Sequence, residues 1–315
     1  MRLLNQALSV LSQHYDIHQP NIEWIQNEPD KTVWKVSDKN GIYILKSDLK
    51  TNPSLIPSIY LQYDLSRQGL NVPEIISTNR RKLCVKLNNR VYFLSRYIHG
   101  QTGTVLERTN AIGDFHQQAR PPHSWPSYRK NLASPVTRAK EWVADYEIKL
   151  NQLKKWEQDY ALPQIRPCVQ LAKKSLKVSS KRIAALEDHF RKVNEKKWLV
   201  HGDLTHRNAI KTKSGDIWLI DLEHSKVDSP VKDIRSLLPK ILLSSMYEIY
   251  FSRFSDGKTF EELYYMDAMF PHSLHSYMGG IIRQQRLPMK SSIIQEVVLD
   301  ELRKDGIISK LWSGD

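Results

Sequence analysis

The stretch Trp198-Leu-Val-His201-Gly-Asp203-Leu-Thr-His-Arg-Asn208-Ala-Ile210, followed by Ile217-Trp-Leu-Ile220-Asp221, decides how the rest of the chain is interpreted. Three apolar residues lead into a loop that holds Asp203 and Asn208, and a second apolar run ends in Asp221. Ser214-Gly215-Asp216 between the two runs is a turn signal, so the pattern predicts a β-hairpin. Because a hairpin brings its two ends together, we expect Asn208 and Asp221 to be neighbours, with Asp203 on the adjoining loop.

Two carboxylates and an amide oxygen at the end of a hairpin suit a hard cation such as Mg²⁺, which leaves room for phosphate oxygens and water. Asn208 and Asp221 are therefore the predicted metal ligands. Asp203 has a different predicted task, because His201 two positions before it and Asn208 five positions after it match the spacing of a kinase catalytic loop. In such loops the aspartate orients the attacking hydroxyl and accepts its proton. Each residue taken alone could instead be a cap or turn residue.

Written as His-Gly-Asp-x-x-x-x-Asn and then Ile-Asp, the motif resembles that of the aminoglycoside phosphotransferase and choline kinase superfamily. Tyr97-Ile-His-Gly100 and Asp228-Ser-Pro230-Val-Lys-Asp233-Ile234 resemble segments of a narrower group, the bacterial spore-coat kinase-like family of the CotS type. The resemblance implies an α+β, two-lobed protein-kinase-like fold. Its nucleotide-binding lobe, an antiparallel sheet plus a helix, would span residues 1–98, and a mostly helical catalytic and acceptor-binding lobe would span residues 99–315.

The first lobe is expected to hold five strands and a helix from Ser58 to Gln68, and the strands are predicted at residues 21–25, 32–37, 42–46, 81–87 and 90–95. On the third strand Ile42, Ile44 and Lys46 share one face. The resemblance makes Lys46 the lysine that holds the α- and β-phosphates of a nucleotide. The alternative is a strand-end lysine whose ammonium only reaches water.

Two features depart from the kinase pattern. The loop Gln26–Lys31 has no glycine, whereas a loop that presents backbone amides to phosphates usually needs one. The helix after the third strand has no glutamate to hold Lys46, and Asp64 is its only acidic residue. Either Asp64 substitutes for the glutamate, or Lys46 is held differently, or Lys46 has no catalytic task.

Several nearby residues are expected to be structural. His116 is predicted to pack under the catalytic loop, and Asp233 to cap a helix or pair with that loop. Glu223 is expected to face solvent, with a place in the metal site as the alternative. Residues 127–197 are predicted to form long basic helices, on which Trp142 and Tyr146 share a face and form core. From the resemblance, the acceptor would bind between these helices and the catalytic loop.

Composition limits the class of protein. The 315 residues are 40% hydrophobic and 26% charged, as in an ordinary globular protein. No apolar run approaches the roughly 20 residues that span a bilayer, and the first ten residues indicate an amphipathic helix rather than a signal peptide. The two cysteines form no disulfide framework or metal-ligand spacing. These features predict a cytoplasmic protein without a membrane partner.

The net charge of +13 favours an anionic partner. Most basic residues lie in helical segments between apolar positions, which is typical of solvated helix faces, so nucleic acid is not the expected partner.

The leading hypothesis is an ATP-dependent (or other nucleoside triphosphate-dependent) Mg²⁺ phosphotransferase acting on an unidentified hydroxyl acceptor. The rival is a catalytically inactive structural or binding component of the spore coat. The resemblance places either one in the mother-cell cytoplasm or the coat, with other coat proteins as further partners.

Overall fold

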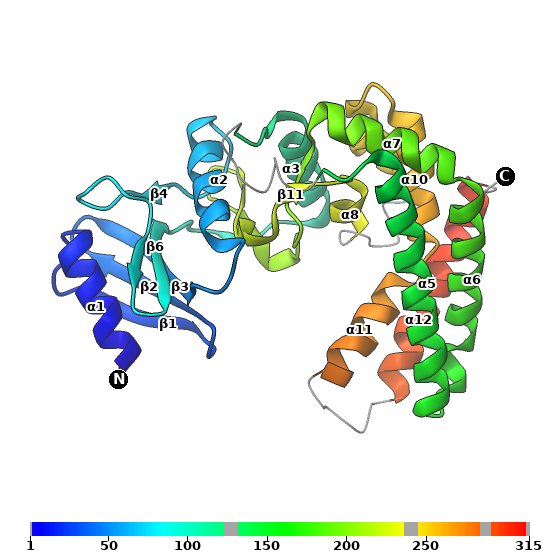
Figure 1. The fold of residues 1–315 in the computed structure, drawn as a ribbon, viewed down its shortest axis with the longest axis horizontal. Coiled ribbons are helices and arrows are strands. Elements are labelled where there is room, and N and C mark those ends of the chain that lie inside the picture. Colours follow the sequence, from blue (N-terminus) through cyan, green and yellow to red (C-terminus); the bar gives the residue numbers. More distant parts are fainter. Residues whose placement is uncertain (1, 123–131, 236–244, 284–290, 313–315) are drawn as a thin grey trace. The chain divides into compact units, whose positions relative to one another are not determined.

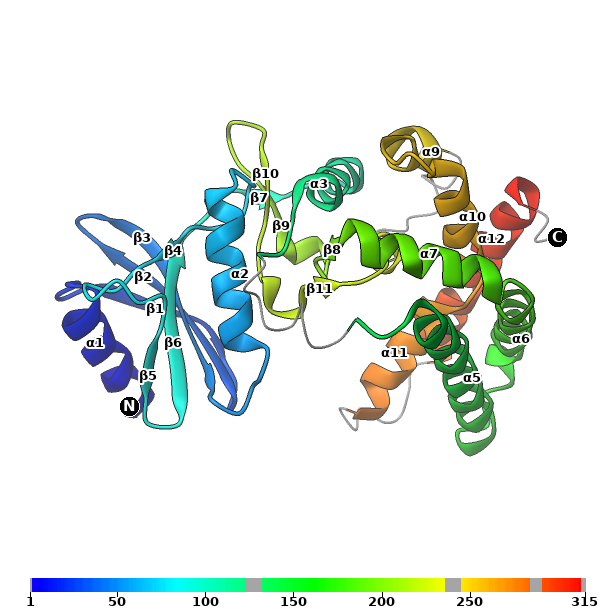
Figure 2. The same ribbon diagram turned by 45° about the horizontal axis from the view of Figure 1, so that its top comes forward.

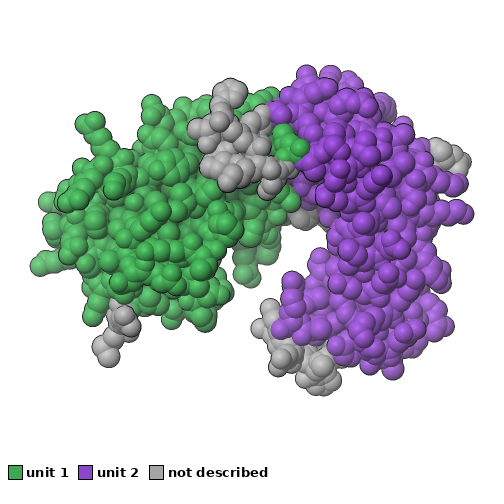
Figure 3. Space-filling view, viewed as in Figure 1, with its two compact units in different colours: residues 1–132, 198–227 green, residues 133–197, 228–315 purple. Residues whose placement is uncertain are grey.

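A computed structural model describes residues 2–122, 132–235, 245–283 and 291–312. The chain divides into two compact units, which Figure 3 colours separately. Unit 1 comprises residues 1–132 and 198–227, and unit 2 comprises residues 133–197 and 228–315. The predicted lobe boundary after residue 98 stays a prediction.

Unit 1 is built on a six-stranded antiparallel sheet. Its strands are β1 (Asn21–Asn27), β2 (Lys31–Asp38), β3 (Gly41–Leu49), β4 (Ile75–Ile76), β5 (Val85–Leu87) and β6 (Arg90–Arg96). They run in the order β1-β2-β3-β6-β4, and β5 also pairs with β6. Lys46 on β3 lies opposite Val33 on β2 and Phe93 on β6, so it stands in the middle of the sheet.

The two faces of this sheet carry different helices. Side chains of α1 (Arg2–His14) pack with Trp34, Leu45 and Tyr92 on one face. The intervening residues, including Val91 and Phe93, belong to the opposite face and pack with α2 (Leu55–Arg67). Figure 2 shows the sheet between the two helices. Because side chains alternate along a strand, Lys46 belongs to the face that carries α2.

The predicted sheet and helix differ from the structure in two details. The sheet has six strands instead of five, because the short strand β4 follows the Val72-Pro73 turn and pairs with β6. The helix begins at Leu55 rather than at Ser58. Pro57 therefore lies in its first turn, where a missing N–H costs no helical hydrogen bond.

The predicted hairpin is confirmed. Strand β9 (Ala209–Lys211) pairs with β10 (Ile217–Leu219), and Leu219 lies opposite Ala209. The short strand β7 (Gln101–Thr102) adds to β9, and β8 (Leu199–Val200) pairs with β11 (Lys226–Val227). The single turns η2 (His206–Asn208) and η3 (Leu222–His224) flank the hairpin, and α3 (Val105–Gln118) precedes it in the chain.

Unit 2 is helical, as Figure 1 shows. Its helices are α5 (Pro135–Asp159), η1 (Pro163–Ile165), α6 (Arg166–Lys181), α7 (Ile183–Lys196), α8 (Val231–Ile234), α9 (Met246–Ile249), η6 (Phe251–Arg253), α10 (Gly257–Ala268), α11 (His272–Arg283) and α12 (Ser291–Leu311). Trp142 and Tyr146 are buried, so they form core as predicted. The expected helical region includes residues 127–131, which lie outside the described residues.

The α+β class, with an antiparallel N-terminal sheet plus helix and a mostly helical remainder, is confirmed. Within the described ranges, no helix is both long and apolar enough to cross a membrane.

Candidate active site

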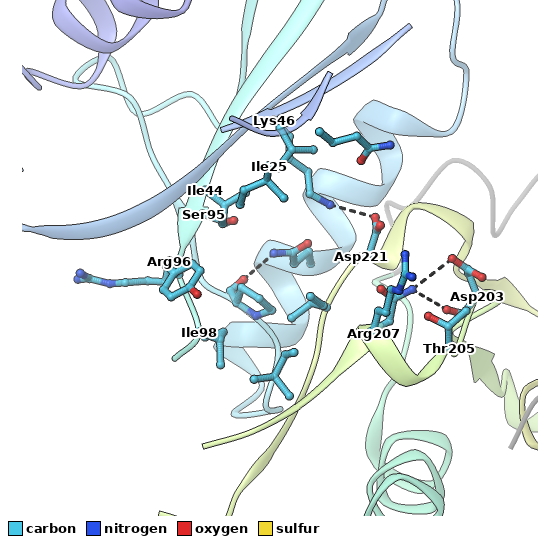
Figure 4. Close-up of a pocket in the computed structure, with 18 of the residues that line it drawn as sticks. Ile25, Ile44, Lys46, Ser95, Arg96, Ile98, Asp203, Thr205, Arg207 and Asp221 are labelled. Carbon is cyan, nitrogen blue, oxygen red and sulfur yellow. Dashed lines mark hydrogen bonds and ion pairs between the residues drawn. The ribbon is translucent and has the colours of Figure 1, made fainter. Parts of the chain in front are cut away.

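A cavity of about 850 Å³ lies within unit 1. The side chains that line it include the apolar residues Ile25, Val33, Ile44, Phe93, Ile98, Ile210 and Ile220 and the four predicted site residues Lys46, Asp203, Asn208 and Asp221. Figure 4 shows Lys46 and Asp221 directed toward each other, with Asp203 and Thr205 on the neighbouring loop. The four predicted residues therefore share one cavity.

Lys46 is held by two carboxylates. Its Nζ lies 3.0 Å from Oδ1 of Asp221 and 3.2 Å from Oε1 of Glu223. The side chain of Lys46 is 16% exposed, so its ammonium is largely removed from water and requires such partners. Asp64 does not line the cavity, and Gln62 is the α2 residue that does. Of the three alternatives for the missing helix glutamate, the contacts favour a lysine that is held differently.

Lys31, the first residue of β2, joins the same cluster. Its Nζ lies 2.8 Å from Oε2 of Glu223 and 3.4 Å from Oδ2 of Asp221. Burial lowers the pKa of Lys31, but the charges of Asp221 and Glu223 outweigh burial and raise it above the ordinary lysine value. The four side chains thus form a quartet of two ammonium groups and two carboxylates, which we call the charge quartet.

Glu223 was expected to face solvent, and this was wrong. Its side chain is only 9% exposed, because η3 turns the chain immediately after Asp221 and packs against α2. Its carboxylate accepts from both lysines, Oε2 from Lys31 and Oε1 from Lys46. Glu223 therefore holds Lys46, which in the kinase pattern is held by a helix glutamate that this chain lacks.

Asn208 stabilises the loop of residues 201–208 through hydrogen bonds to Asp203. Its Nδ2 donates to the backbone oxygen of Asp203 at 2.8 Å and to Oδ2 of Asp203 at 3.2 Å. The backbone oxygen of Asn208 accepts from the N–H of Ile220, which precedes Asp221. Since Nδ2 of Asn208 is engaged with Asp203, Oδ1 is the atom with which Asn208 could bind a cation.

His201 links this loop to the end of β10. Its Nε2 lies 2.8 Å from the carbonyl oxygen of Ile220, and its Nδ1 accepts from the N–H of Asp203 at 3.3 Å. Both contacts fit a neutral ring with the proton on Nε2, because a carbonyl can only accept. Gly202 has φ of +84°, and a Cβ there would come within 2.3 Å of the carbonyl oxygen of His224. The glycine of the His-Gly-Asp motif is thus required by close backbone approach.

Asp221 is unusual in both backbone and charge. Its φ is 66°, in the left-handed region that residues other than glycine seldom adopt, at a cost of about 1 kcal/mol or more. Burial opposes ionisation of the carboxyl, but the positive charges of Lys46 and Lys31 prevail and hold its pKa well below the ordinary aspartate value. Asp221 is therefore a fixed anion that faces a cavity.

The donor set fits Mg²⁺ only together with a phosphate ligand. Within the described ranges, no group of three or more His, Cys, Asp or Glu side chains could hold a metal ion. Mg²⁺ commonly takes one or two carboxylates plus the phosphate oxygens of a substrate. Asp221 and the amide oxygen of Asn208 are compatible with that role, and two ammonium groups already sit beside the Asp221 carboxylate as positive charges.

A lysine on a central strand, an aspartate after a hairpin and an Asp–Asn loop in one cavity define the class of kinase-like phosphotransferases. Comparisons with known proteins support this class. The model of the "Phosphotransferase enzyme family" (APH) matches residues 25–263, which is more than half of the chain. The chain belongs to this family, and it is an enzyme of the ATP-dependent, small-molecule kinase type.

Solved structures show the same fold. An aminoglycoside phosphotransferase from Alicyclobacillus acidocaldarius is 15% identical, covers 97% of this chain and 94% of its own, and has a TM-score of 0.66. Spectinomycin phosphotransferase in complex with ADP and spectinomycin is 15% identical, with 95% and 98% coverage and a TM-score of 0.61. The macrolide 2′-phosphotransferase MphH from Brachybacterium faecium is 12% identical, with 96% and 98% coverage and a TM-score of 0.56. The predicted kinase-like fold and phosphotransferase superfamily are confirmed.

Proposed function

We propose that this chain transfers the γ-phosphate of ATP, with Mg²⁺, to a hydroxyl group of a small-molecule acceptor. The observation that carries the proposal is the convergence of Lys46, Asp203, Asn208 and Asp221 on one partly apolar cavity of about 850 Å³. The apolar lining suits a nucleotide base, and the lysines suit phosphates. Spectinomycin phosphotransferase, a structural neighbour, has been crystallised with ADP and spectinomycin, which supports a nucleotide and a small-molecule acceptor here too.

Each residue has a distinct role in the proposed reaction. Lys46 binds phosphate oxygens, and Asp203 orients the acceptor hydroxyl and accepts its proton. The hydroxyl oxygen bonds to the γ-phosphorus while the bond from that phosphorus to the bridging oxygen breaks, and ADP leaves. Mg²⁺, held by Asn208 and Asp221, would neutralise charge on the phosphates. The remaining catalysis comes from positioning the two reactants.

The proposal is tested by separating binding from turnover. The variant Asp203→Asn keeps an acceptor for the Asn208 amide but cannot accept a proton, so MgATP should still raise the melting temperature. Turnover should fall by about 10²- to 10⁴-fold, the usual contribution of a general base. ADP formation in the presence of candidate acceptors is the measurement. Equal rates for wild type and variant would remove Asp203 from its role.

We further propose that the protein is associated with the spore coat of a spore-forming bacterium. Support comes only from the resemblance of segments such as Asp228–Ile234 to CotS-type proteins. In that setting the rival role is a kinase-fold coat component without turnover. Mass spectrometry of purified coats against mother-cell cytoplasm tests the location, and absence from the coat fraction would refute it.

The acceptor site remains a proposal of its own. Related small-molecule kinases bind acceptors in the lobe that carries the catalytic loop, and from that resemblance we assign the acceptor to residues 99–315. The lobe boundary after residue 98 is proposed on the same grounds. Acceptor-dependent protection within residues 99–315 in hydrogen exchange is the direct test, and protection confined to residues 1–98 would contradict both assignments.

A further inference from the structure

The loop between β1 and β2 lacks the means by which kinase loops usually hold phosphates. It contains no glycine, and its tip is Glu28-Pro29-Asp30. Pro29 has no N–H, and the N–H of Glu28 is donated to the carbonyl oxygen of Lys31 at 3.0 Å. Two of the tip amides are therefore unavailable to a phosphate, and the tip carries two acidic side chains that would repel one.

Lys31 lies immediately after this tip and faces the cavity. It belongs to the same face of β2 as Val33, which pairs with Lys46. Its ammonium and that of Lys46 contact the same two carboxylates, Asp221 and Glu223. Both lysines line the cavity, so both ammonium groups can be reached from it.

Arg90 fixes the loop from the interior of the sheet. Its guanidinium donates to the carbonyl oxygens of Pro29 at 3.0 Å and Asp30 at 2.9 Å. The same group is anchored to β3 by Nε, which donates to Oγ of Ser47 at 2.6 Å. Arg90 is 7% exposed, so these bonds are sheltered from water. The loop is thereby held without glycine, and the residue that follows it has a defined position.

We propose that Lys31 is a second phosphate-binding lysine, which supplies from a side chain the positive charge that a glycine-rich loop supplies from backbone amides. This inference rests on the proposed function. In the charge quartet the positive and negative charges balance. With a magnesium nucleotide bound, Asp221 would hold the cation and the ammonium groups of Lys31 and Lys46 would donate to phosphate oxygens, while Glu223 would keep both lysines close to the site.

Calorimetric titration of the full chain with MgATP, MgADP and adenosine tests this role without an activity assay. Lys31→Met removes the charge but keeps an unbranched side chain. A charge-assisted hydrogen bond to phosphate contributes enough that MgATP affinity should fall by about 10- to 100-fold, while adenosine affinity stays within about threefold of wild type. Lys31→Arg retains the charge and should lose less than about tenfold. Lys39→Met, which removes the same charge from the exposed turn at the far end of β2, should bind MgATP as wild type does.

The outcomes separate this inference from the proposed function. If wild type and Lys31→Met bind MgATP equally well, Lys31 has no phosphate role, although the nucleotide site stands. If Lys31→Met loses MgATP and adenosine affinity equally, the lysine supports the cavity in general and the inference fails. If wild type binds no MgATP, both the proposed function and the inference fail.

Discussion

The two units each contain a cluster of opposite charges, and the clusters differ in their access to water. In unit 1 the charge quartet of Lys31, Lys46, Asp221 and Glu223 borders a cavity, and its side chains are 9–26% exposed. In unit 2 the carboxylate of Asp267 is 1% exposed. The first cluster can exchange its partners for a ligand, whereas the second is closed.

The closed cluster is fully satisfied by protein groups. The Asp267 carboxylate accepts from Nε of Arg235 at 2.7 Å and from the Tyr146 hydroxyl at 2.6 Å, and a second Arg235 nitrogen completes a bidentate pair. Burial disfavours the charge, but Arg235 outweighs burial and holds the pKa of Asp267 far below the ordinary value. A strongly lowered carboxyl pKa therefore has two different meanings in this protein. Asp221 in unit 1 faces a cavity and belongs to a candidate functional site, whereas Asp267 in unit 2 is enclosed and stabilises the fold.

The largest expected effect tests the closed cluster. Asp267→Asn removes the negative charge and leaves the guanidinium of Arg235 without compensation in the interior. We expect the free energy of unfolding to fall by about 3–5 kcal/mol, as for other broken buried pairs. Asp145→Asn, which removes a half-exposed partner of Lys149 on α5, should cost less than about 1 kcal/mol. Urea unfolding measures the free energy of unfolding of both variants. A similar small loss for the two would show that Asp267 does not stabilise the fold.

Local signals in the sequence predicted the hairpin and the loop that precedes it. The turn at residues 214–216 and the two apolar runs are close in the chain, so the positions of Asn208 and Asp221 at the two ends followed from strand pairing alone. The roles of Lys31 and Glu223 did not follow in this way. Glu223 reaches Lys46 only because Asp221 adopts a left-handed conformation and η3 reverses the chain, and no local pattern indicates such a reversal.

The position of Lys31 at the cavity depends on the register between β2 and β3. Lys31 faces the cavity because Val33, two residues later, pairs with Lys46, and this pairing across the turn at residues 38–41 could have been worked out from the predicted strands. The sequence predicts that the second strand begins at Thr32, which leaves Lys31 in the loop. The partner of Asp267 could not be predicted from the sequence either. An aspartate in the apolar run Tyr264–Phe270 requires a buried partner, but Arg235 lies in a different helical segment, and only the packing of unit 2 brings the two together.

An intermediate effect concerns pH. Burial, together with the charges of Arg138 and Arg235 respectively, lowers the pKa of His189 and of His272 to about 3. Unfolded histidine takes up a proton near pH 6.5, so acid favours the unfolded chain. The stability that these histidines contribute is fully present above about pH 6.5 and is lost as pH falls toward their folded pKa. Between about pH 7 and pH 5.5 the two together should lower the free energy of unfolding by about 2–3 kcal/mol.

Urea unfolding at the two pH values measures this loss. Carboxylates with lowered pKa values stay charged in both states over this window, so they do not contribute to the slope. His272→Gln should reduce this loss by about 1 kcal/mol. A slope that His272→Gln does not alter would assign the pH dependence to other groups and weaken the contrast between the sealed interior of unit 2 and the open cavity of unit 1.

The smallest expected effect belongs to the open cluster. In the absence of nucleotide, Asp221→Asn should change the free energy of unfolding by about 1 kcal/mol or less. Glu223 still pairs with both lysines, both lysines border the cavity, and asparagine tolerates the left-handed φ. MgATP at about 100 times its Kd should stabilise wild type by about 2.7 kcal/mol and the variant hardly at all. Asp216→Asn in the hairpin turn should keep the full stabilisation. If Asp221→Asn without nucleotide cost as much as Asp267→Asn, or if it responded to MgATP as wild type does, Asp221 would be a structural carboxylate like Asp267 rather than a ligand-binding one.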